Sequence, residues 1–374
     1  MANWGGMQRV ATELAEALEA HPQVEVIPVV LRTSWAMTSI RAAPFIAGLL
    51  ARIPRQVHTH RIDVVLFASM ITAGAAVALR RKLRSLGVPT AGITHGLDMT
   101  YALWGYQWWI PRVLNALDLV LPVSRAVRDA CLERGAQPGQ LQVIPNGVRA
   151  EWFAADTVSE AERATSRARL DPQGVLPERA FLLCSVGRHI ERKGVAWFVR
   201  EVMPRLPDQV HYWSAGDGPA TRQIEREITA AGLQHRVRLL GPLSDDALEM
   251  LYRSADLMVM PNIPVHGEVE GFGVVMLEAG MCGLQTLAAD LDGIRDVIEE
   301  GENGFLAPPG DADRFAQRIT DGLNDPAMLR DAPARAAGYT RSHFAWTVVA
   351  NRYVEVLHAL AESGRKTPQQ HGAT

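Results

Sequence analysis

The stretch Glu270-Gly-Phe-Gly-Val-Val-Met-Leu-Glu278 places two glutamates at the ends of an apolar run that opens with Gly271 and Gly273. The apolar spacing predicts a helix from about Gly273 to Met281, packed against a sheet. A helix that begins behind a glycine turn presents free backbone N–H groups and a partial positive charge, which suit a phosphate or a sugar hydroxyl. Taken alone, the stretch also fits an ordinary buried helix with one acidic residue at its start and one hydrogen-bonded glutamate.

The composition is that of an ordinary globular protein. The 374 residues are 48% hydrophobic and 21% charged, which allows two domains with substantial cores. A net charge of -3 provides no field that would attract nucleic acid or an anionic membrane. The three cysteines are isolated, which argues against a disulfide framework and a zinc site. Because no apolar run is long enough to span a membrane and no signal peptide is recognisable, we expect a cytoplasmic protein.

Apolar runs alternate with helical patterns in the first half. Strands are predicted at residues 24–31, 64–67, 90–94, 119–123 and 141–144, and helices at 7–18, 73–86 and 125–134. His95-Gly96 follows the third strand, and Ser124 is a natural N-cap for the last helix. This alternation predicts an α/β fold with a parallel, doubly wound sheet.

A polar stretch at residues 154–178 predicts the crossing between two domains. Beyond it, strands are predicted at 181–186, 211–215, 237–240, 257–260, 285–289 and 304–307, and a helix from 346 to about 360. We expect a first domain at 1–165, a second at 176–345, a helix at 346–362 that returns to the first domain, and a disordered tail at 363–374. Ligands of open α/β sheets bind beyond the carboxyl ends of the strands, so two such halves are expected to face each other across one cleft.

Two cations follow the first strand of the second half, in the segment from Gly187-Arg188 to Lys193-Gly194. Arginine offers a planar fork of donors and lysine a compact charge, and together they suit a diphosphate. Two cations in a loop are more often solvated surface charges. Here, however, the two cations lie in the same α/β half as the helix predicted between Glu270 and Glu278, and this favours the diphosphate interpretation.

The second half resembles the donor domain of a family 4 glycosyltransferase with the GT-B fold of two Rossmann-like domains. Four segments carry the resemblance in order: Gly187-Arg188 to Lys193-Gly194, Gly216-Asp-Gly-Pro219, Ser254 to Pro261, and Glu270 to Glu278. The first half is similar more loosely, through Gly5-Gly6, His95-Gly96, Ser124 and Ile144-Pro-Asn-Gly147. The resemblance covers about residues 5–345, and its specificity comes from the order and spacing of motifs that are weak singly.

The resemblance implies retaining transfer of a hexose from a UDP- or GDP-linked sugar to a hydroxyl of a sugar, lipid or small molecule. It assigns the donor diphosphate to Arg188 and Lys193, the donor sugar to Glu270, and the ribose hydroxyls to Glu278. It also implies donor contacts from the backbone at Gly187, Gly216, Gly271, Phe272, Gly273 and Val274, and from Gly5 and Gly6 in the first half. His95 is expected near the transferred sugar.

Charge builds on the departing β-phosphate when a glycosyl group leaves a nucleoside diphosphate, and preorganised donors lower that barrier. Arg188, Lys193 and the helix N-terminus can supply such donors, so we expect no metal and no cofactor. No carboxylate must act as a covalent nucleophile, which favours front-face attack. Asp290-Leu-Asp292 spells the metal-binding Asp-x-Asp of another transferase fold, but it follows a strand where a glycine-rich loop is expected.

The chain departs from the family pattern at several positions. Only four residues precede Gly5, so we expect the first strand of the N-terminal domain to be absent. Gln285, Asp292 and Asp296 stand where the family often has Pro, Gly and Glu, which affects the expected donor sugar more than the reaction class. Two alternatives stay open: a sugar-nucleotide epimerase of the same fold, and a catalytically impaired sugar-nucleotide binding protein.

Two apolar segments of the first half could touch an acceptor or a membrane. Trp104, Tyr106, Trp108 and Trp109 crowd one short segment, and residues 40–53 form an amphipathic pattern between arginines. Packing within the protein explains each segment equally well or better. Peripheral membrane contact therefore stays open beside the expected partners, a nucleoside-diphosphate sugar and a hydroxyl-bearing acceptor.

Overall fold

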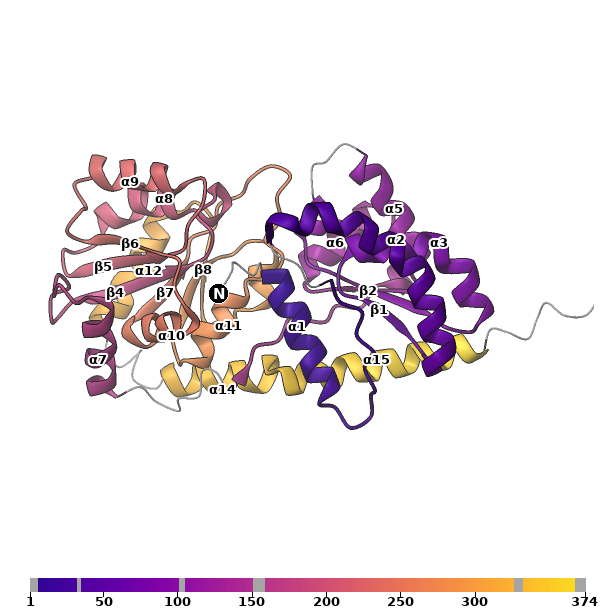
Figure 1. The fold of residues 1–374 in the computed structure, drawn as a ribbon. Coiled ribbons are helices and arrows are strands. Elements are labelled where there is room, and N and C mark those ends of the chain that lie inside the picture. Colours follow the sequence, from indigo (N-terminus) through magenta and orange to yellow (C-terminus); the bar gives the residue numbers. More distant parts are fainter. Residues whose placement is uncertain (1–5, 32–34, 101–104, 151–158, 326–331, 367–374) are drawn as a thin grey trace, which may run out of the picture. The chain divides into compact units, whose positions relative to one another are not determined.

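The structure, a computed structural model, describes residues 6–31, 35–100, 105–150, 159–325 and 332–366. The chain divides into two compact units, which Figure 1 shows coloured along the sequence. Unit 1 consists of Met1–Gly147 and Trp346–Thr374, and unit 2 consists of Val148–Ala345. The change of unit thus falls at Gly147 and Val148 rather than at residues 165–176, and the last helix belongs to unit 1.

Unit 1 is built on a parallel sheet with the order β1 (Val65–Phe67), β2 (Thr90–Thr94), β3 (Leu119–Pro122). All five residues of β2 are buried, as expected for a strand covered on both faces. The helices of this unit are α1 (Gly6–Glu19), α2 (Trp35–His60), α3 (Met70–Ser85), α4 (Leu97–Thr100), α5 (Tyr106–Ala116), α6 (Arg125–Glu133) and α15 (Trp346–Lys366), with a 3-10 turn η1 (Pro138–Gln140). The Ser124 side chain caps α6 by accepting from the Val127 N–H at 3.2 Å, as predicted.

Two predicted strands of unit 1 were wrong or only partly formed. Residues 24–31 are irregular, and Val30 is 64% exposed. A strand needs a neighbour for its backbone groups, no described strand pairs with this segment, and Pro28 has no N–H to donate. Residues 141–144 lie beside β3, but only Leu141 forms a bridge, to Val120.

Unit 2 is built on a six-stranded parallel sheet whose order reverses at its centre. The order is β6 (Val237–Gly241), β5 (Val210–Ala215), β4 (Phe181–Val186), β7 (Leu257–Met260), β8 (Thr286–Ala289), β9 (Gly304–Ala307). All six strands were predicted from apolar runs. Chain connections leave β4 and β7 in opposite directions, which is the switch point where doubly wound sheets bind ligands.

Helices cover both faces of this sheet (Figure 1). They are α7 (Glu160–Leu170), α8 (Val195–Trp197), α9 (Thr221–Ala230), α10 (Asp245–Ser254), α11 (Val274–Met281), α12 (Ala312–Asn324) and α14 (Ala332–Phe344), with the short elements η3 (Glu191–Lys193), η4 (Phe198–Val202), η5 (Met203–Arg205) and η6 (Asp292–Asp296). A core of buried side chains from η4, α9, α12 and the strands includes Phe198, whose ring centroid lies 4.9 Å from that of Tyr212. Among the remaining helices of this unit, α7 packs against α10, and α11 packs against α14.

The prediction of an interdomain crossing at 154–178 was wrong over the described part of that range. Residues 160–170 form α7, which belongs to unit 2. Arg163 and Arg167 bind the two carboxylate oxygens of Asp256 at 2.5 and 2.8 Å, and Asp256 also accepts the Leu182 N–H at 2.7 Å. Because ion pairs rather than an apolar stripe attach this helix, hydrophobic periodicity did not reveal it.

The predicted disordered tail begins too early, because α15 continues to Lys366. Residues 367–374 lie outside the described residues. The amphipathic segment at 40–53 is part of α2, which buries Leu49 and Ile53 and packs on α3 of its own unit, while Leu50 stays exposed.

Candidate active site

The loops that follow β4, β5 and β7 touch one another backbone to backbone. A Cβ on Gly216, whose φ is +139°, would lie 1.8 Å from the carbonyl oxygen of Gly187. A Cβ on Gly194, whose φ is +68°, would lie 1.8 Å from the carbonyl oxygen of Pro261. Glycine is therefore required at both positions, and it draws the predicted cation loop against its neighbours at the carboxyl ends of the central strands.

The predicted helix of the opening stretch forms as α11, eight residues from Val274 to Met281. Gly273 precedes it in the left-handed region, with φ +89°, and the first-turn N–H groups of such a helix have no partner within the helix. Phe272 points into the protein, where its ring centroid lies 6.1 Å from that of Phe344. The backbone of Gly271 to Val274, rather than the Phe272 ring, is thus the part suited to an anionic ligand.

Glu270, just before this turn, lies in a buried cluster of donors. Its Oε2 atom accepts from the Lys193 ammonium at 2.7 Å, from the Asn262 amide at 2.9 Å and from the Arg192 guanidinium. Burial by itself would raise the pKa of this carboxyl, but the charges of Lys193 and then Arg192 outweigh burial and lower the pKa of Glu270 to about 2. The structure thus brings two predicted site residues, Glu270 and Lys193, into direct contact as an ionised pair.

Arg188 lies on the same loop but is exposed. It lines a small hollow together with Gly187, Lys193, Ser185, Ser214 and Pro261, among others. Within the described residues its guanidinium makes no hydrogen bond or ion pair, whereas Lys193 is already engaged. Arg188 is therefore the cation of this loop that is free to bind an anion.

Glu278 lies in the interior of α11 and is only 3% exposed. Its Oε2 accepts from the Tyr252 hydroxyl at 2.9 Å. Burial, followed by the nearby Glu278, raises the pKa of Tyr252 well above its usual value, so the hydroxyl stays a donor. The role predicted for Glu278 at ribose hydroxyls stays a prediction.

Two further residues of this loop make buried contacts that no sequence motif indicated. Arg192 binds Glu268 at 3.1 Å as well as Glu270, and His189 bridges Thr221 and Ser214 at 3.0 and 3.1 Å. Burial lowers the pKa of His189, which favours a neutral imidazole between the two hydroxyls. The position of Arg192 directly before Lys193 was the one feature of the sequence that could have indicated its place in the site.

The two aspartates of the Asp-x-Asp sequence are each bound to a protein group. Asp290 pairs with Arg295 at 2.5 Å, and Asp292 accepts the backbone N–H of Glu270 at 2.9 Å. Burial raises the pKa of Asp292, and the nearby Glu270 charge adds to that rise, although the Glu270 N–H lowers it. Across the described residues, no group of three His, Cys, Asp or Glu side chains is placed to hold a metal ion.

In unit 1, His95 follows β2 and is buried, with its Nε2 atom 3.1 Å from the Ala68 carbonyl oxygen. Its backbone N–H and that of Gly96 donate to Asp98 at 2.8 and 3.0 Å, so Asp98, which the sequence analysis did not single out, shapes this turn. Gly6 is the first residue of α1, and Gly5 lies outside the described residues. The roles predicted for His95, Gly5 and Gly6 stay predictions.

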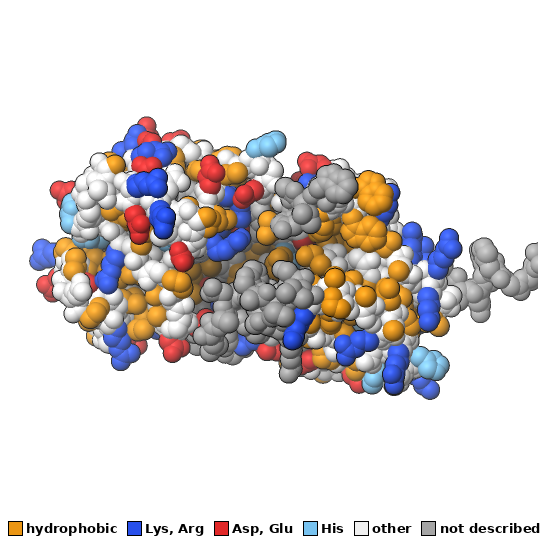
Figure 2. All heavy atoms as spheres, turned by 45° about the horizontal axis from the view of Figure 1, so that its top comes forward, with side chains coloured by type: hydrophobic (Ala, Val, Ile, Leu, Met, Phe, Trp, Pro, Cys, Tyr) orange, Lys and Arg blue, Asp and Glu red, His pale blue; other side chains and the backbone are white. Residues whose placement is uncertain are grey.

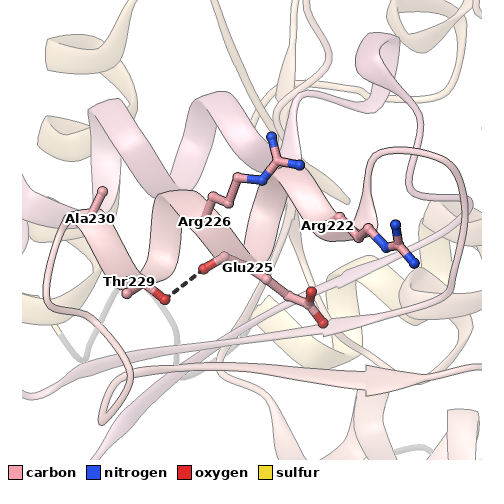
Figure 3. A pocket seen from close by; sticks show the side chains of 5 residues that line it. All are labelled: Arg222, Glu225, Arg226, Thr229 and Ala230. Atoms are coloured by element: carbon pink, nitrogen blue, oxygen red, sulfur yellow. Dashed lines mark hydrogen bonds between the residues drawn. The ribbon is translucent and has the colours of Figure 1, made fainter.

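A second, wide hollow lies on unit 2 over α9. Its lining residues all come from that helix: Arg222, Glu225, Arg226, Thr229 and Ala230 (Figure 3). Their side chains are exposed, and the hydrogen bond drawn there, from the Thr229 hydroxyl to the Glu225 carbonyl at 2.9 Å, lies within the helix. Because no other element closes over it, this hollow is an open helix surface rather than a built site.

Two parallel α/β units, the second doubly wound with an ionised carboxylate between cations at its switch point, have the architecture of the GT-B fold class. Residues 4–152 match the family described as Glycosyltransferase Family 4, and residues 180–325 match the family described as Glycosyl transferases group 1. The chain belongs to the family 4 glycosyltransferases. The predicted fold class and enzyme class are thereby confirmed.

Two relatives illustrate the match. A "GDP-mannose-dependent alpha-(1-6)-phosphatidylinositol monomannoside mannosyltransferase" of Mycolicibacterium smegmatis is 25% identical over 86% of this chain and 81% of its own length. A "Phosphatidyl-myo-inositol mannosyltransferase" of Mycobacterium tuberculosis is 34% identical over 60% of this chain, and the match spans 55% of that relative's length.

Solved structures share the fold. HepE of Anabaena in complex with UDP has a TM-score of 0.78 at 20% identity, over 96% of this chain and 98% of that one. Sucrose-phosphate synthase of Thermosynechococcus elongatus has a TM-score of 0.73 at 22% identity, over 96% and 94% of the two chains.

In the described part of the chain, every helix is too short or too polar to cross a lipid bilayer.

Proposed function

We propose that this protein transfers a hexose from a UDP- or GDP-linked sugar to a hydroxyl of a sugar, lipid or small-molecule acceptor, with retention and without a metal. The observation that carries the proposal is the buried Glu270 carboxylate, held ionised by Lys193 beside the start of α11. A fixed carboxylate suits sugar hydroxyls, and the cations and helix N-terminus suit the diphosphate.

Each group has a distinct proposed role. Arg188 and Lys193, with the backbone at Gly187, Gly216 and the first turn of α11, bind the donor diphosphate and stabilise the charge that builds on it. Glu270 orients the donor sugar, and Glu278 serves the ribose end. The bond from the anomeric carbon to the phosphate oxygen breaks as the acceptor oxygen bonds to the same face. The acceptor proton passes to the departing phosphate, so both charge and atoms balance.

Names of similar proteins support a nucleotide sugar as donor without fixing its base. The mycolicibacterial relative is named for GDP-mannose, and HepE was solved with UDP. A thermal-shift panel of UDP, GDP and their sugars is the first test, because a bound ligand raises the melting temperature by mass action. We expect one base to stabilise the chain clearly more than the other.

Turnover then separates the proposal from its alternatives. Incubation with the stabilising donor and candidate acceptors should release the nucleoside diphosphate and give a product with the donor's anomeric configuration, read by NMR. An epimerase would convert the donor without releasing nucleotide, and an impaired binding protein would do neither. Either result would refute the proposed transfer.

Metal independence has its own support in the contacts of Asp290 and Asp292, which a metal would have to displace. Turnover should therefore survive EDTA, because Arg188, Lys193 and the start of α11 can neutralise the leaving phosphate. Loss of turnover in EDTA with rescue by Mg²⁺ or Mn²⁺ would refute this part of the proposal.

A lipid-bearing acceptor is supported by the surface of unit 1, where hydrophobic side chains gather on the face drawn in Figure 2. The exposed large hydrophobic residues of this unit include Leu50, Ile71, Leu97 and Trp108, and Trp108 is 63% exposed with the Arg112 guanidinium 3.4 Å from its ring centroid. Co-sedimentation with phosphatidylinositol-containing vesicles, compared for the wild type and Trp108→Ala, tests this surface. A soluble sugar acceptor would leave both proteins in the supernatant.

A further inference from the structure

One residue beside the donor cluster has an unfavourable backbone conformation. Asp292, the first residue of η6, has a φ of +49°, and Arg61 is the one other non-glycine residue with positive φ among the described residues. L-residues adopt this region at a cost, and such residues persist where surrounding contacts hold them, often at functional sites. The contacts of Asp292 are therefore informative.

Asp292 and Gly293 form hydrogen bonds with the backbone N–H and the backbone carbonyl of Glu270. The Asp292 carboxylate accepts the Glu270 N–H at 2.9 Å, and the Gly293 N–H donates to the Glu270 carbonyl at 3.0 Å. A Cβ on Gly293 would lie 2.1 Å from the Gly271 carbonyl oxygen, so the two backbones are in contact. The loop after β8 thus fixes the peptide groups on both sides of the Glu270 Cα.

The Glu270 side chain is fixed separately, at one oxygen. Lys193, Arg192 and Asn262 all bind Oε2, and within the described residues Oε1 makes no hydrogen bond. With the main chain held by Asp292 and one carboxylate oxygen held by three donors, the direction of Oε1 is set. Glu270 therefore presents one oriented acceptor.

We propose that Asp292 is a positioning residue that aims the free carboxylate oxygen of Glu270 at a hydroxyl of the donor sugar. This inference rests on the proposed function. The proposal explains why an aspartate rather than a glycine stands at this left-handed position. Glycine would adopt that φ at less cost, but it has no side chain to accept the Glu270 N–H. An asparagine at position 292 keeps a side-chain oxygen that can accept the Glu270 N–H. An alanine has neither that acceptor nor the conformational freedom of glycine.

Kinetics of Asp292→Gly and Asp292→Asn test the proposal directly. We expect Asp292→Gly to lower kcat by roughly 10-fold or more with a donor KM within about threefold of wild type, since aim matters most in the transition state. Asp292→Asn should recover most of kcat. Asp290→Asn, on the same loop but paired with Arg295, is the matched control and should behave as wild type.

A double-mutant cycle excludes a merely structural role. If Asp292 acts through Glu270, Asp292→Gly should cause no further loss of kcat in a Glu270→Gln background. Equal losses of kcat in both backgrounds, or wild-type kinetics for Asp292→Gly, would overturn the proposal.

A second measurement does not depend on turnover. The pH dependence of stability that is due to Glu270 is the difference between wild type and Glu270→Gln between about pH 5 and pH 2. Asp292→Gly should shrink that difference, because a Glu270 side chain that is no longer held in place loses contact with its cations, and an unchanged difference would overturn the inference. A wild type that transfers no sugar would refute the proposed function instead, and this measurement would still decide whether Asp292 holds Glu270.

Discussion

The Lys193 ammonium lies 2.7 Å from Oε2 of Glu270, so the cation predicted for the diphosphate and the carboxylate predicted for the sugar form one buried ion pair. Arg192 shares the same oxygen. We therefore expect Lys193 to be able to turn toward a phosphate while Arg192 still compensates the charge of Glu270. The pair therefore couples the two ends of the proposed donor site.

Removal of either loop cation should impair turnover, but with different effects on stability. We expect Arg188→Ala and Lys193→Ala each to lower kcat by about 10²-fold or more, the usual loss for one preorganised donor. Arg188→Ala should melt like the wild type because its side chain is exposed, whereas Lys193→Ala should melt lower because it breaks the pair with Glu270. Arg222→Ala, in the open hollow on α9, is the control, and near-normal kcat in either test variant would remove that cation from the mechanism.

Glu270 should make stability depend on acid pH. Its pKa is lowered to about 2 in the folded chain, whereas an unfolded glutamate titrates near ~4.3. A depressed folded pKa gives stability that is complete above the unfolded pKa and is lost as pH falls toward about 2. Urea denaturation should thus show a large deficit of Glu270→Gln at pH 7 that narrows steadily between about pH 4.5 and pH 2. A deficit that stays constant with pH would mean that the carboxylate is not held ionised.

Gly194 should tolerate alanine far less than Gly232 does. Both have a φ of +68°, but a Cβ on Gly194 meets the Pro261 carbonyl at 1.8 Å and a Cβ on Gly232 meets nothing within 4 Å. Gly232→Ala should cost about 1–2 kcal/mol from backbone strain alone. Gly194→Ala should cost about 1–3 kcal/mol more from overlap and should also weaken donor binding. Equal losses of unfolding free energy in the two variants would show that the loops are not in contact.

Asp256 should be a major anchor of α7. Asp256→Ala leaves Arg163, Arg167 and the Leu182 N–H without their shared acceptor, and we expect a loss of about 2–4 kcal/mol in the free energy of unfolding. Asp313→Ala is the matched control, since Asp313 pairs with Arg205 but is 91% exposed and should cost less than about 1 kcal/mol. Urea titrations compare the two, and a similar small loss in both would show that α7 is held by other contacts.

The sequence by itself determined the class of this protein because its signals are local. Apolar runs of strand length predicted every strand of unit 2, and the glycines around Arg188 and Lys193 and before α11 predicted the turns that follow two of these strands. Such features depend on backbone conformation and on burial of neighbouring residues, both of which one stretch of sequence records. The order of these motifs sufficed to identify the family.

Tertiary structure alone decided which of those charges meet. Arg192 and Asp292 reach Glu270 from the loops after two other strands, and Asp256 binds a helix that the sequence pattern had assigned to a linker. Ion pairs and side-chain hydrogen bonds leave no periodic trace, since a charged residue in a loop reads the same whether it faces water or a partner. The failure of the strand predicted at residues 24–31 has the same kind of cause. A strand forms only when its backbone groups pair with a neighbouring strand, and the sequence of the segment does not show whether such a neighbour is present.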